Sequence, residues 1–439
     1  MSQIKRTIKK LLPKSMWIIL KKVRYTPLYI YEFYLISIAS KMHQKALERV
    51  RRKKRLKVVF FLIHESVWKY EGLYYLMDKD DRFEPIVVLC PDLKNSGADM
   101  AIEMNRTYSN FIQKGYNAIQ TYDESEKKWL DVKTRLKPDF VFYTNPNSLT
   151  KKEYLITNFP ETLTFYVPYG FMITDRPKMQ FDMLFHNLVY KVFHESAFHH
   201  EQAKKHSRVK GRNSIVTGYP GIDKFIFQSD TSKKLVKNHK FKRKKVIWAP
   251  HHTIEKEETS FNYSCFLEYS RFILDLTESY KNVIDFVFKP HPILKPKLKK
   301  ADYWGKEKTE KYYKEWEMRS NCELCEGDYS ELFLNADAMI HDSGSFLVEF
   351  ISMNKPSLYM IRNDSIVDGF SELGKQVIDC HYKSFTKEDV TNFIETVIIE
   401  GVDTLERKRR TLIEDKLHPP NEKRASENIF DEVCNLVNE

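Results

Sequence analysis

Residues 335–350 read NADAMIHDSGSFLVEF, in which a short apolar strand leads into a polar turn that contains one glycine. We expect a helix to begin directly after this turn. The backbone N–H groups around Gly344 and Ser345 would then lie at the positive end of that helix, where phosphate binds well. The alternative is an ordinary helix start, in which Asp342 or Ser343 caps the first amides.

A second group of polar residues follows another apolar strand earlier in the chain. Residues 283–288 form that strand, and Lys289, Pro290, His291 and Pro292 come directly after it. Because ligands bind at the carboxyl ends of the strands in an open α/β sheet, the two motifs together predict a site for a nucleotide diphosphate compound. The alternatives are a turn histidine at position 291 and a solvated lysine at position 289.

A third strand, residues 246–249, ends in Pro250, His251 and His252. One of these histidines is expected to line the same site, and the alternative is that both cap the following turn. No acidic triad or D-x-D motif follows any expected strand. The sequence therefore predicts a site that requires no metal ion and no other cofactor.

The net charge of +12 conceals an asymmetry between the two ends of the chain. Residues 1–55 contain 16 Lys and Arg against two acidic residues, a balance of +14. The remaining residues contain 56 basic and 58 acidic side chains, a balance of −2. The basicity thus belongs to the N-terminal segment. No recognised nucleic-acid motif follows that segment and the rest is mildly acidic, so we expect no nucleic-acid partner.

Basic pairs alternate with apolar stretches in residues 1–55. Residues 16–20 and 28–38 are largely apolar, but Glu32 interrupts the second stretch, and neither reaches the ~18–20 uncharged residues of a spanning helix. This mixture favours a basic amphipathic helix on an anionic membrane, where each Lys or Arg contributes roughly 1 kcal/mol. The alternative is a helical hairpin that packs on the rest of the protein.

The six cysteines are scattered, and no secretory signal peptide precedes them. Cys322 and Cys325 form a lone CxxC with no second pair, for which ordinary reduced thiols are favoured over zinc binding or redox use. Together with the basic segment, the cysteines predict a cytoplasmic protein that is peripheral on the inner face of the cell membrane.

Strands and helices alternate from residue 56 onward, which is typical of α/β proteins with parallel sheets. Strands are expected at residues 56–63, 84–89, 117–120, 139–143, 162–167, 189–193, 214–217, 246–249, 283–288, 323–325, 338–340, 357–361 and 376–378. Helices are expected between them, including residues 68–77, 129–136 and 426–437. A charged linker, residues 229–245, separates the two halves.

This pattern predicts a GT-B-like architecture, with two Rossmann-like domains that face each other across a cleft. We expect a basic helical segment at residues 1–55, an N-terminal acceptor domain at residues 56–228 and a C-terminal nucleotide-donor domain at residues 229–439.

The C-terminal half resembles the CDP-glycerol glycerophosphotransferases of the teichoic-acid polymerase and primase type. Their consensus has a strand that ends in A-P, an H-P motif and then T-D-Y-S-S-x-x-x-D-F. The corresponding residues here are Trp248-Ala249-Pro250, His291-Pro292, and His341 to Ser345 with Glu349-Phe350. The N-terminal half carries T-G-Y-P-G-I-D at residues 217–223, where the family has T-G-Y-P-R-x-D. The resemblance covers roughly residues 56–400.

The chain departs from the family pattern in two places. The family has H-G-T after the strand that ends here at Val167, and its histidine is thought to act as the base, whereas this chain has Pro168, Tyr169 and Gly170. In the T-D-Y-S-S motif, Ser343 replaces Tyr, Gly344 replaces the first Ser and Glu349 replaces Asp. The absent histidine affects the acceptor chemistry more than donor binding.

The resemblance implies transfer of a glycerophosphate-type unit from a CDP-alcohol, such as CDP-glycerol, to a membrane-linked or capsular or teichoic-acid-like glycan, with CMP leaving. The expected donor-binding residues are Pro250, His251, Lys289, His291, Asp342, Ser343, Gly344, Ser345 and Glu349. His291 would donate to a phosphate oxygen. Glu349 suits a ribose diol, and an ion pair on the face of its helix is the alternative.

The base is expected in the N-terminal domain, where three residues are candidates. Tyr169 occupies the family's base position, but a phenol with a pKa near ~10 is a poor base. Asp175 follows on the same loop, and His194 ends the next strand, so both are better chemical candidates.

Three other classes of function fit the same pattern. One is a metal-independent GT-B glycosyltransferase that uses a CMP- or UDP-sugar, because the fold does not decide the substrate. A sugar-nucleotide epimerase is the second, although it has no need of a membrane-binding segment. A non-catalytic assembly protein that kept the fold without the base is the third.

Overall fold

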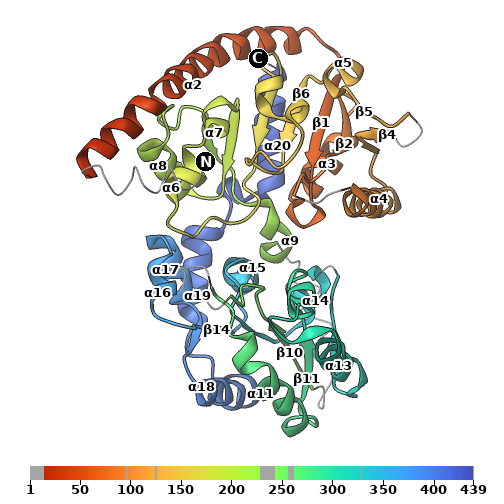
Figure 1. Cartoon of the computed structure of the whole chain (residues 1–439), viewed down its shortest axis with the longest axis vertical. Coiled ribbons are helices and arrows are strands. Elements are labelled where there is room, and N and C mark those ends of the chain that lie inside the picture. Colours follow the sequence, from red (N-terminus) through yellow and green to blue (C-terminus); the bar gives the residue numbers. More distant parts are fainter. Residues whose placement is uncertain are drawn as a thin grey trace.

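The first domain is built on a seven-stranded parallel sheet with the strand order β3-β2-β1-β6-β7-β8-β9 (Figure 1). Its strands are β1 (Leu56–Leu62), β2 (Phe83–Leu89), β3 (Ala118–Gln120), β6 (Phe140–Tyr143), β7 (Leu163–Tyr166), β8 (Lys191–His194) and β9 (Ser214–Val216). The central strands are apolar because helices cover both faces of the sheet.

The computed structural model describes residues 14–94, 97–123, 126–227, 243–255, 262–327 and 329–438.

Short helices connect the strands of the first domain. They are α3 (Glu71–Asp78), α4 (Gly97–Gln113), α5 (Val132–Leu136), α6 (Pro177–Phe181), α7 (Leu184–Leu188), α8 (Ala197–His206) and α9 (Asp223–Ile226). A small antiparallel hairpin of β4 (Tyr122–Asp123) and β5 (Lys128–Trp129) precedes α5. The helix expected at residues 129–136 is therefore shorter than predicted, because its first residue pairs in this hairpin.

The second domain contains a six-stranded parallel sheet with the order β12-β11-β10-β13-β14-β15. Its strands are β10 (Lys244–Ala249), β11 (Ile284–Phe288), β12 (Cys322–Leu324), β13 (Ala338–His341), β14 (Ser357–Met360) and β15 (Tyr382–Ser384). Its helices include α11 (Phe266–Ser279), α12 (Leu294–Leu298), α13 (Gly305–Met318), α14 (Ser330–Asn335), α15 (Phe346–Ile351), α16 (Ser365–Asp368), α17 (Glu372–Ile378), α18 (Lys387–Asn392) and α19 (Glu406–Leu412).

The strand predicted at residues 376–378 is wrong, because these residues form the end of helix α17. Ser371 accepts a hydrogen bond from the Gly374 amide and caps the start of the helix. Leu373 and Val377 then lie one turn apart on its buried face. A short apolar run does not distinguish a strand from a buried helix segment, and the last strand of the sheet is β15 instead.

The C-terminal helix α20 (Ala425–Asn438) returns to the first domain (Figure 1). Ile429 and Val433 are buried in the same core cluster as Leu73 of α3 and Leu56 of β1. The chain therefore crosses between the two domains twice, once before β10 and once before α20.

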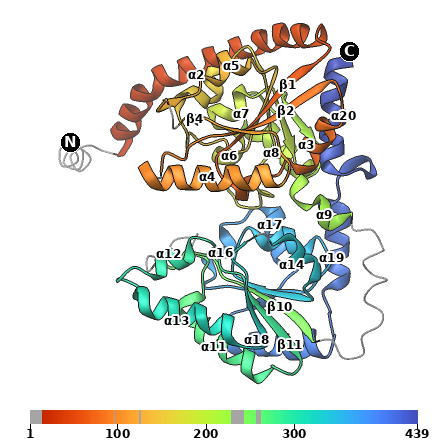
Figure 2. The same cartoon turned by 90° about the vertical axis from the view of Figure 1, so that its right-hand side faces the viewer.

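Helix α2 (Lys14–Arg51) lies across the end of the first domain that is farthest from the second domain (Figure 1 and Figure 2). Its C-terminal half packs on the domain, because Ala39, Ala46 and Val50 are buried. Residues 14–51 thus form one long helix and not the helical hairpin that was the alternative. Residues 1–13 of the predicted membrane segment, and most of the predicted linker at residues 229–245, lie outside the described residues.

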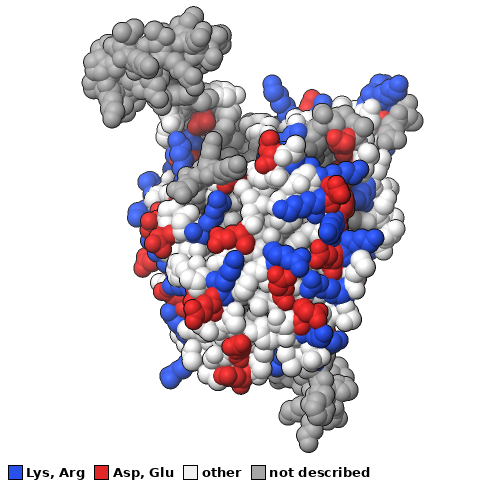
Figure 3. All heavy atoms as spheres, turned by 60° about the horizontal axis from the view of Figure 1, so that its bottom comes forward, with Lys and Arg blue, Asp and Glu red and all other residues white. Residues whose placement is uncertain are grey.

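The surface of the second domain carries charges of both signs. On the face in Figure 3, basic and acidic side chains alternate and neither sign forms a large patch.

The six cysteines form no disulfide bond, and four of them are buried. No helix in the described part of the chain is long and apolar enough to cross a membrane.

Candidate functional site

The carboxyl ends of β10, β11 and β13 form one edge of the second sheet. The sheet order changes direction between β10 and β13, which is where a doubly wound sheet opens a crevice for ligands. His251 and His252 follow β10, His291 follows β11, and Asp342 follows β13. The fold thus brings the three predicted donor motifs to one place.

Asp342 is buried and organises this edge. Its two carboxylate oxygens accept hydrogen bonds from the His251 amide at 2.5 Å and from the Cys265 amide at 2.6 Å. Burial raises the pKa of Asp342 to about 7, and the two amide hydrogen bonds oppose that rise. Asp342 therefore fixes the loop after β10, and the position of the histidines on that loop depends on it.

The turn before α15 is accessible to a ligand only at its last residues. Ser343 is buried, Gly344 is half-buried and Ser345 is exposed. Ser345 makes no capping hydrogen bond through its side chain at the start of α15. A Cβ placed on Gly344 would lie 3.8 Å from the Tyr263 ring, so the turn itself has room for a side chain there.

His251, His252 and His291 form a cluster at the centre of the edge. The ring centroids of His251 and His252, and those of His252 and His291, are 4.3 Å apart. Burial lowers the pKa of His251 to about 2 and that of His291 to about 3, so both imidazoles are neutral at pH 7. Among the described residues, this is the group whose side chains come close enough to hold a metal ion.

Glu349 forms an ion pair across the two domains. Its carboxylate lies 3.3 Å from the Lys69 ammonium of the first domain and accepts a hydrogen bond from the Tyr329 hydroxyl at 2.7 Å. Both charged side chains are largely buried, with 11% and 7% exposure. Lys289 is also buried, and its ammonium lies 5.8 Å from the centre of the Tyr329 ring. The structure therefore holds Glu349 in an ion pair, but with a residue of the other domain and not with a neighbour on its own helix.

Two of the three base candidates line one cavity in the first domain. This cavity of about 120 Å³ lies at the ends of β6, β7 and β8, and Tyr169 and His194 both line it. Asp175 is exposed and does not line the cavity, and its amide donates to the Gly369 carbonyl of the second domain at 2.9 Å. Burial raises the pKa of Tyr169, so the phenolate that would have to act as the base is even less populated at neutral pH.

Glu195 is a site residue that the sequence analysis did not select. One of its carboxylate oxygens lies 3.3 Å from His194 Nδ1, and the other accepts the Met172 amide at 3.1 Å. Burial acts to raise the pKa of Glu195, but His199 and His194 bring it below its ordinary value. A carboxylate beside Nδ1 of a histidine orients the ring and stabilises its protonated form, as a general base requires.

Arg176 connects the two halves of the site. It lines the first-domain cavity, and its charge lowers the pKa of both Tyr169 and Tyr263 against the rise that burial causes. Tyr263 belongs to the second domain and its ring lies 5.5 Å from that of His251. The guanidinium is thus close enough to Tyr169 of the first domain and to Tyr263 of the second domain to act on both. The sequence gives no spacing signal for such a residue.

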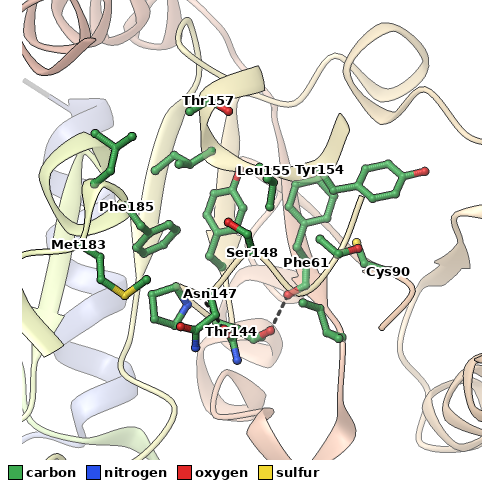
Figure 4. A pocket seen from close by; sticks show the side chains of 17 residues that line it. Phe61, Cys90, Thr144, Asn147, Ser148, Tyr154, Leu155, Thr157, Met183 and Phe185 are labelled. Atoms are coloured by element: carbon green, nitrogen blue, oxygen red, sulfur yellow. Dashed lines mark hydrogen bonds between the residues drawn. The ribbon is translucent and has the colours of Figure 1, made fainter. Parts of the chain in front are cut away.

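A second, apolar cavity of about 140 Å³ adjoins the first at the ends of β1, β2 and β6 (Figure 4). Phe61, Tyr154 and Phe185 line it, and Asn147 lines both cavities. The position between β1 and β6 is the point where the order of the first sheet reverses. The first domain therefore offers a polar and an apolar compartment side by side.

The profile of a family described as CDP-glycerol:poly(glycerophosphate) glycerophosphotransferase matches residues 172–435. No curated protein sequence matches the chain. A structure of the wall teichoic acid polymerase TagF, 12% identical, has a TM-score of 0.56 and covers 95% of this chain and 98% of that chain.

Two structures with UDP or UDP-GlcNAc bound are similar to a comparable degree. The UDP complex of S. aureus MnaA is 17% identical, has a TM-score of 0.55 and covers 88% of this chain and 98% of that chain. UDP-GlcNAc 2-epimerase from Neisseria meningitidis, bound to UDP-GlcNAc, is 15% identical, with a TM-score of 0.52 and coverage of 87% and 99%. The predicted α/β, GT-B-like fold with two Rossmann-like domains is confirmed.

The buried ion pair between Lys69 and Glu349 should behave as one unit. Removing one partner leaves an uncompensated buried charge, which costs about 3–5 kcal/mol. We expect Lys69→Met and Glu349→Gln each to lower the thermal unfolding midpoint by roughly 5–10 °C, and the double variant to regain much of that loss.

Lys423 and Asp431 form an ion pair whose side chains are about half exposed, which makes Lys423→Met a matched control with little expected effect. Additive losses in the Lys69 and Glu349 double variant would show that the two charges do not act together.

Proposed function

Because the chain belongs to the CDP-glycerol:poly(glycerophosphate) glycerophosphotransferase family, we propose that it transfers a polyol phosphate unit from a CDP-alcohol to a glycan acceptor of the teichoic-acid or capsular type. The observation that carries the proposal is the meeting of the three donor motifs at one sheet edge, around His251, His291 and Asp342. The donor is proposed to be CDP-glycerol or a similar CDP-alcohol.

The proposed reaction moves a phosphoryl group between two oxygens. The acceptor hydroxyl attacks the distal phosphorus, a new phosphodiester bond forms, the phosphoanhydride bond breaks and CMP leaves. His194 takes the hydroxyl proton, and Glu195 stabilises the resulting imidazolium. Arg176 and the histidine cluster face the charge that develops on the phosphoryl oxygens. The reaction as proposed needs no cofactor, because the Arg176 guanidinium supplies positive charge and the neutral histidines supply hydrogen-bond donors.

The apolar cavity beside the His194 cavity supports a lipid-linked acceptor. Asn147 lines both compartments, so an acceptor with a polar head and an apolar portion would place one in each. The core cluster around the apolar cavity includes Ala39 of α2, with Leu35 and Ile36 packed against it. The apolar compartment is therefore adjacent to the helix proposed to contact the membrane.

The thermal stability of the purified protein in the presence of nucleotides tests the donor. A ligand at a hundredfold excess over its Kd stabilises the folded state by about 2.7 kcal/mol. We expect CDP-glycerol or CDP-ribitol to raise the unfolding midpoint and to support transfer, whereas UDP-GlcNAc does neither. A shift with UDP-GlcNAc alone would favour a glycosyltransferase or an epimerase, and binding of CDP-glycerol without transfer to any acceptor would favour a non-catalytic protein.

The assignment of the base predicts different outcomes for two variants. His194→Ala should lower turnover by ~10²–10⁴-fold and leave the affinity for CDP unchanged, because only the transition state loses an interaction. Asp175→Asn is the comparison, since Asp175 lies outside the cavity. Turnover in single-turnover assays and calorimetric titration with CDP measure the two effects. If Asp175→Asn lost turnover while His194→Ala kept the turnover of the wild type, Asp175 would be the base.

The exposed side of α2 supports the proposal that the protein is peripheral on the inner, anionic face of the cell membrane. Ile30, Phe33 and Tyr34 are exposed by 64%, 55% and 59%, although they are apolar or aromatic. Residues 1–55 also carry the balance of +14. Large apolar side chains beside basic ones are typical of helices at a membrane interface.

We expect the triple variant Ile30→Ser, Phe33→Ser and Tyr34→Ser to lose binding to phosphatidylglycerol vesicles without loss of thermal stability, because none of the three side chains is buried. Ile102→Ser removes a side chain that is 65% exposed on α4 and serves as the control. Cosedimentation with vesicles measures the effect. Unchanged binding of the triple variant would contradict the membrane role of α2.

A further inference from the structure

The turn after β9 contacts both parts of the first domain that carry base candidates lining the cavity. The amides of Thr217 and Gly218 donate to the His194 carbonyl at 3.0 Å and 3.3 Å. The next residue of the turn, Tyr219, donates its hydroxyl hydrogen to the Tyr169 carbonyl at 3.3 Å. One short turn therefore holds the end of β8 and the loop after β7, residues 167–176, which both contribute to the polar cavity.

Tyr219 is suited to hold the loop because its side chain is enclosed and stays a donor. It is fully buried, at 0% exposure. Its ring packs edge-on against Phe171 of the same loop, with the ring centres 5.9 Å apart. Burial raises the pKa of the Tyr219 hydroxyl, and the negative charge of Glu349 raises it further. The phenol therefore remains protonated at neutral pH and donates to the loop.

Gly221 provides the space that the Tyr219 ring occupies. A Cβ on Gly221 would lie 2.5 Å from Cε1 and 2.8 Å from the hydroxyl oxygen of Tyr219. Because the ring is buried in a packed core, it has no free volume into which it could move aside. A side chain at position 221 would therefore displace the ring and separate its hydroxyl from the Tyr169 carbonyl.

Two departures from the family motifs meet at this hydrogen bond. Residues 168–170 read Pro-Tyr-Gly where the family has H-G-T, and Gly221 stands where the family motif T-G-Y-P-R-x-D has Arg. The first departure changes the loop that accepts the hydrogen bond, and the second makes room for the ring that donates it. The two changes therefore belong to one local arrangement, although they follow different strands.

We propose that Tyr219 is a positioning residue for the loop after β7, and that position 221 must be glycine because any side chain there would displace the ring. The loop runs from Tyr169 through Met172 to Arg176, and all three residues line the polar cavity. Tyr219 does not line it and acts on its shape through the loop. That the cavity receives the acceptor rests on the proposed function, whereas the hold on the loop rests on the contacts of Tyr219.

Amide hydrogen exchange of residues 169–176, measured by mass spectrometry on the full chain, tests the hold on the loop. Tyr219→Phe removes only the hydroxyl, and Gly221→Ala adds only the Cβ. We expect each variant to raise the exchange of these amides roughly fivefold to tenfold, which is the effect of one lost hydrogen bond. Unchanged exchange in either variant would overturn the proposal. If Gly221→Ala does not fold, Tyr219→Phe decides alone.

Two matched controls lie in the second domain. Tyr312→Phe removes a buried hydroxyl that donates to the Ser270 carbonyl at 2.9 Å, and Gly327→Ala adds a Cβ that meets no atom within 4 Å. Neither should change the exchange of the loop. The double variant of Tyr219→Phe and Gly221→Ala should exchange no faster than the more affected single variant, because both substitutions remove the same hydrogen bond. Additive increases would contradict this account.

Transfer kinetics separate a positioning role from a general loss of stability. With CDP-glycerol as donor and a poly(glycerol phosphate) primer as acceptor, we expect Tyr219→Phe to raise the acceptor KM roughly fivefold to tenfold. The kcat and the affinity for CDP should stay unchanged, because His194 and the second domain keep their contacts. A lower kcat with an unchanged KM would overturn the positioning role. If the wild type transfers nothing, the proposed function fails, and hydrogen exchange still decides whether Tyr219 holds the loop.

Discussion

The buried carboxylate of Asp342 makes the interactions on which the second-domain side of the candidate site depends. It follows β13, yet its two oxygens accept the amides of His251, after β10, and of Cys265, at the start of α11. Parallel strands bring their carboxyl ends to one edge, but they do not determine where the loops beyond them go. Asp342 supplies that missing constraint, because a buried carboxylate must satisfy its oxygens and the amides of both loops donate to them. The histidine cluster is thus positioned by a residue that is itself buried.

The second constraint is the contact that holds the two domains together. Phe171 and Ile173 of the first domain share a core cluster with Phe370 of the second. The Ile173 carbonyl accepts both the amide and the hydroxyl of Ser371, and a Cβ on Gly374 would collide with the same carbonyl. The loop that makes this close approach continues to Arg176, which lines the first-domain cavity and whose charge acts on Tyr263 of the second domain. The contact that joins the domains and the placement of this guanidinium therefore belong to one loop.

Sequence reasoning predicted the elements that its local signals specify. Strands such as β1 and β2 are long apolar runs, so their burial on both faces could be predicted, whereas residues 376–378 are too short to separate a strand from a helix. The motifs after β10, β11 and β13 could be assigned to one edge because parallel topology places strand ends together. Lys69, Glu195 and Arg176 could not be selected in the same way. The partner of Lys69 is 280 residues away in the chain, and Glu195 and Arg176 gain their meaning only from the cavity that folding creates.

The neighbouring strands β7 and β8 offer a physical account of the base that the family pattern places elsewhere. Their parallel register pairs Tyr166 with Val192, so the loop that carries Tyr169 and the strand end that carries His194 leave the sheet at the same edge. Both side chains line one cavity. A base proposed at the end of β8 would therefore reach the same cavity as a base on the loop after β7, and a carboxylate beside it would orient its ring. Glu195 meets that condition, because its amide contact with Met172 ties the carboxylate to the loop after β7 while its other oxygen faces His194. The loop that lacks the histidine of the family thus helps to orient the histidine proposed to replace it.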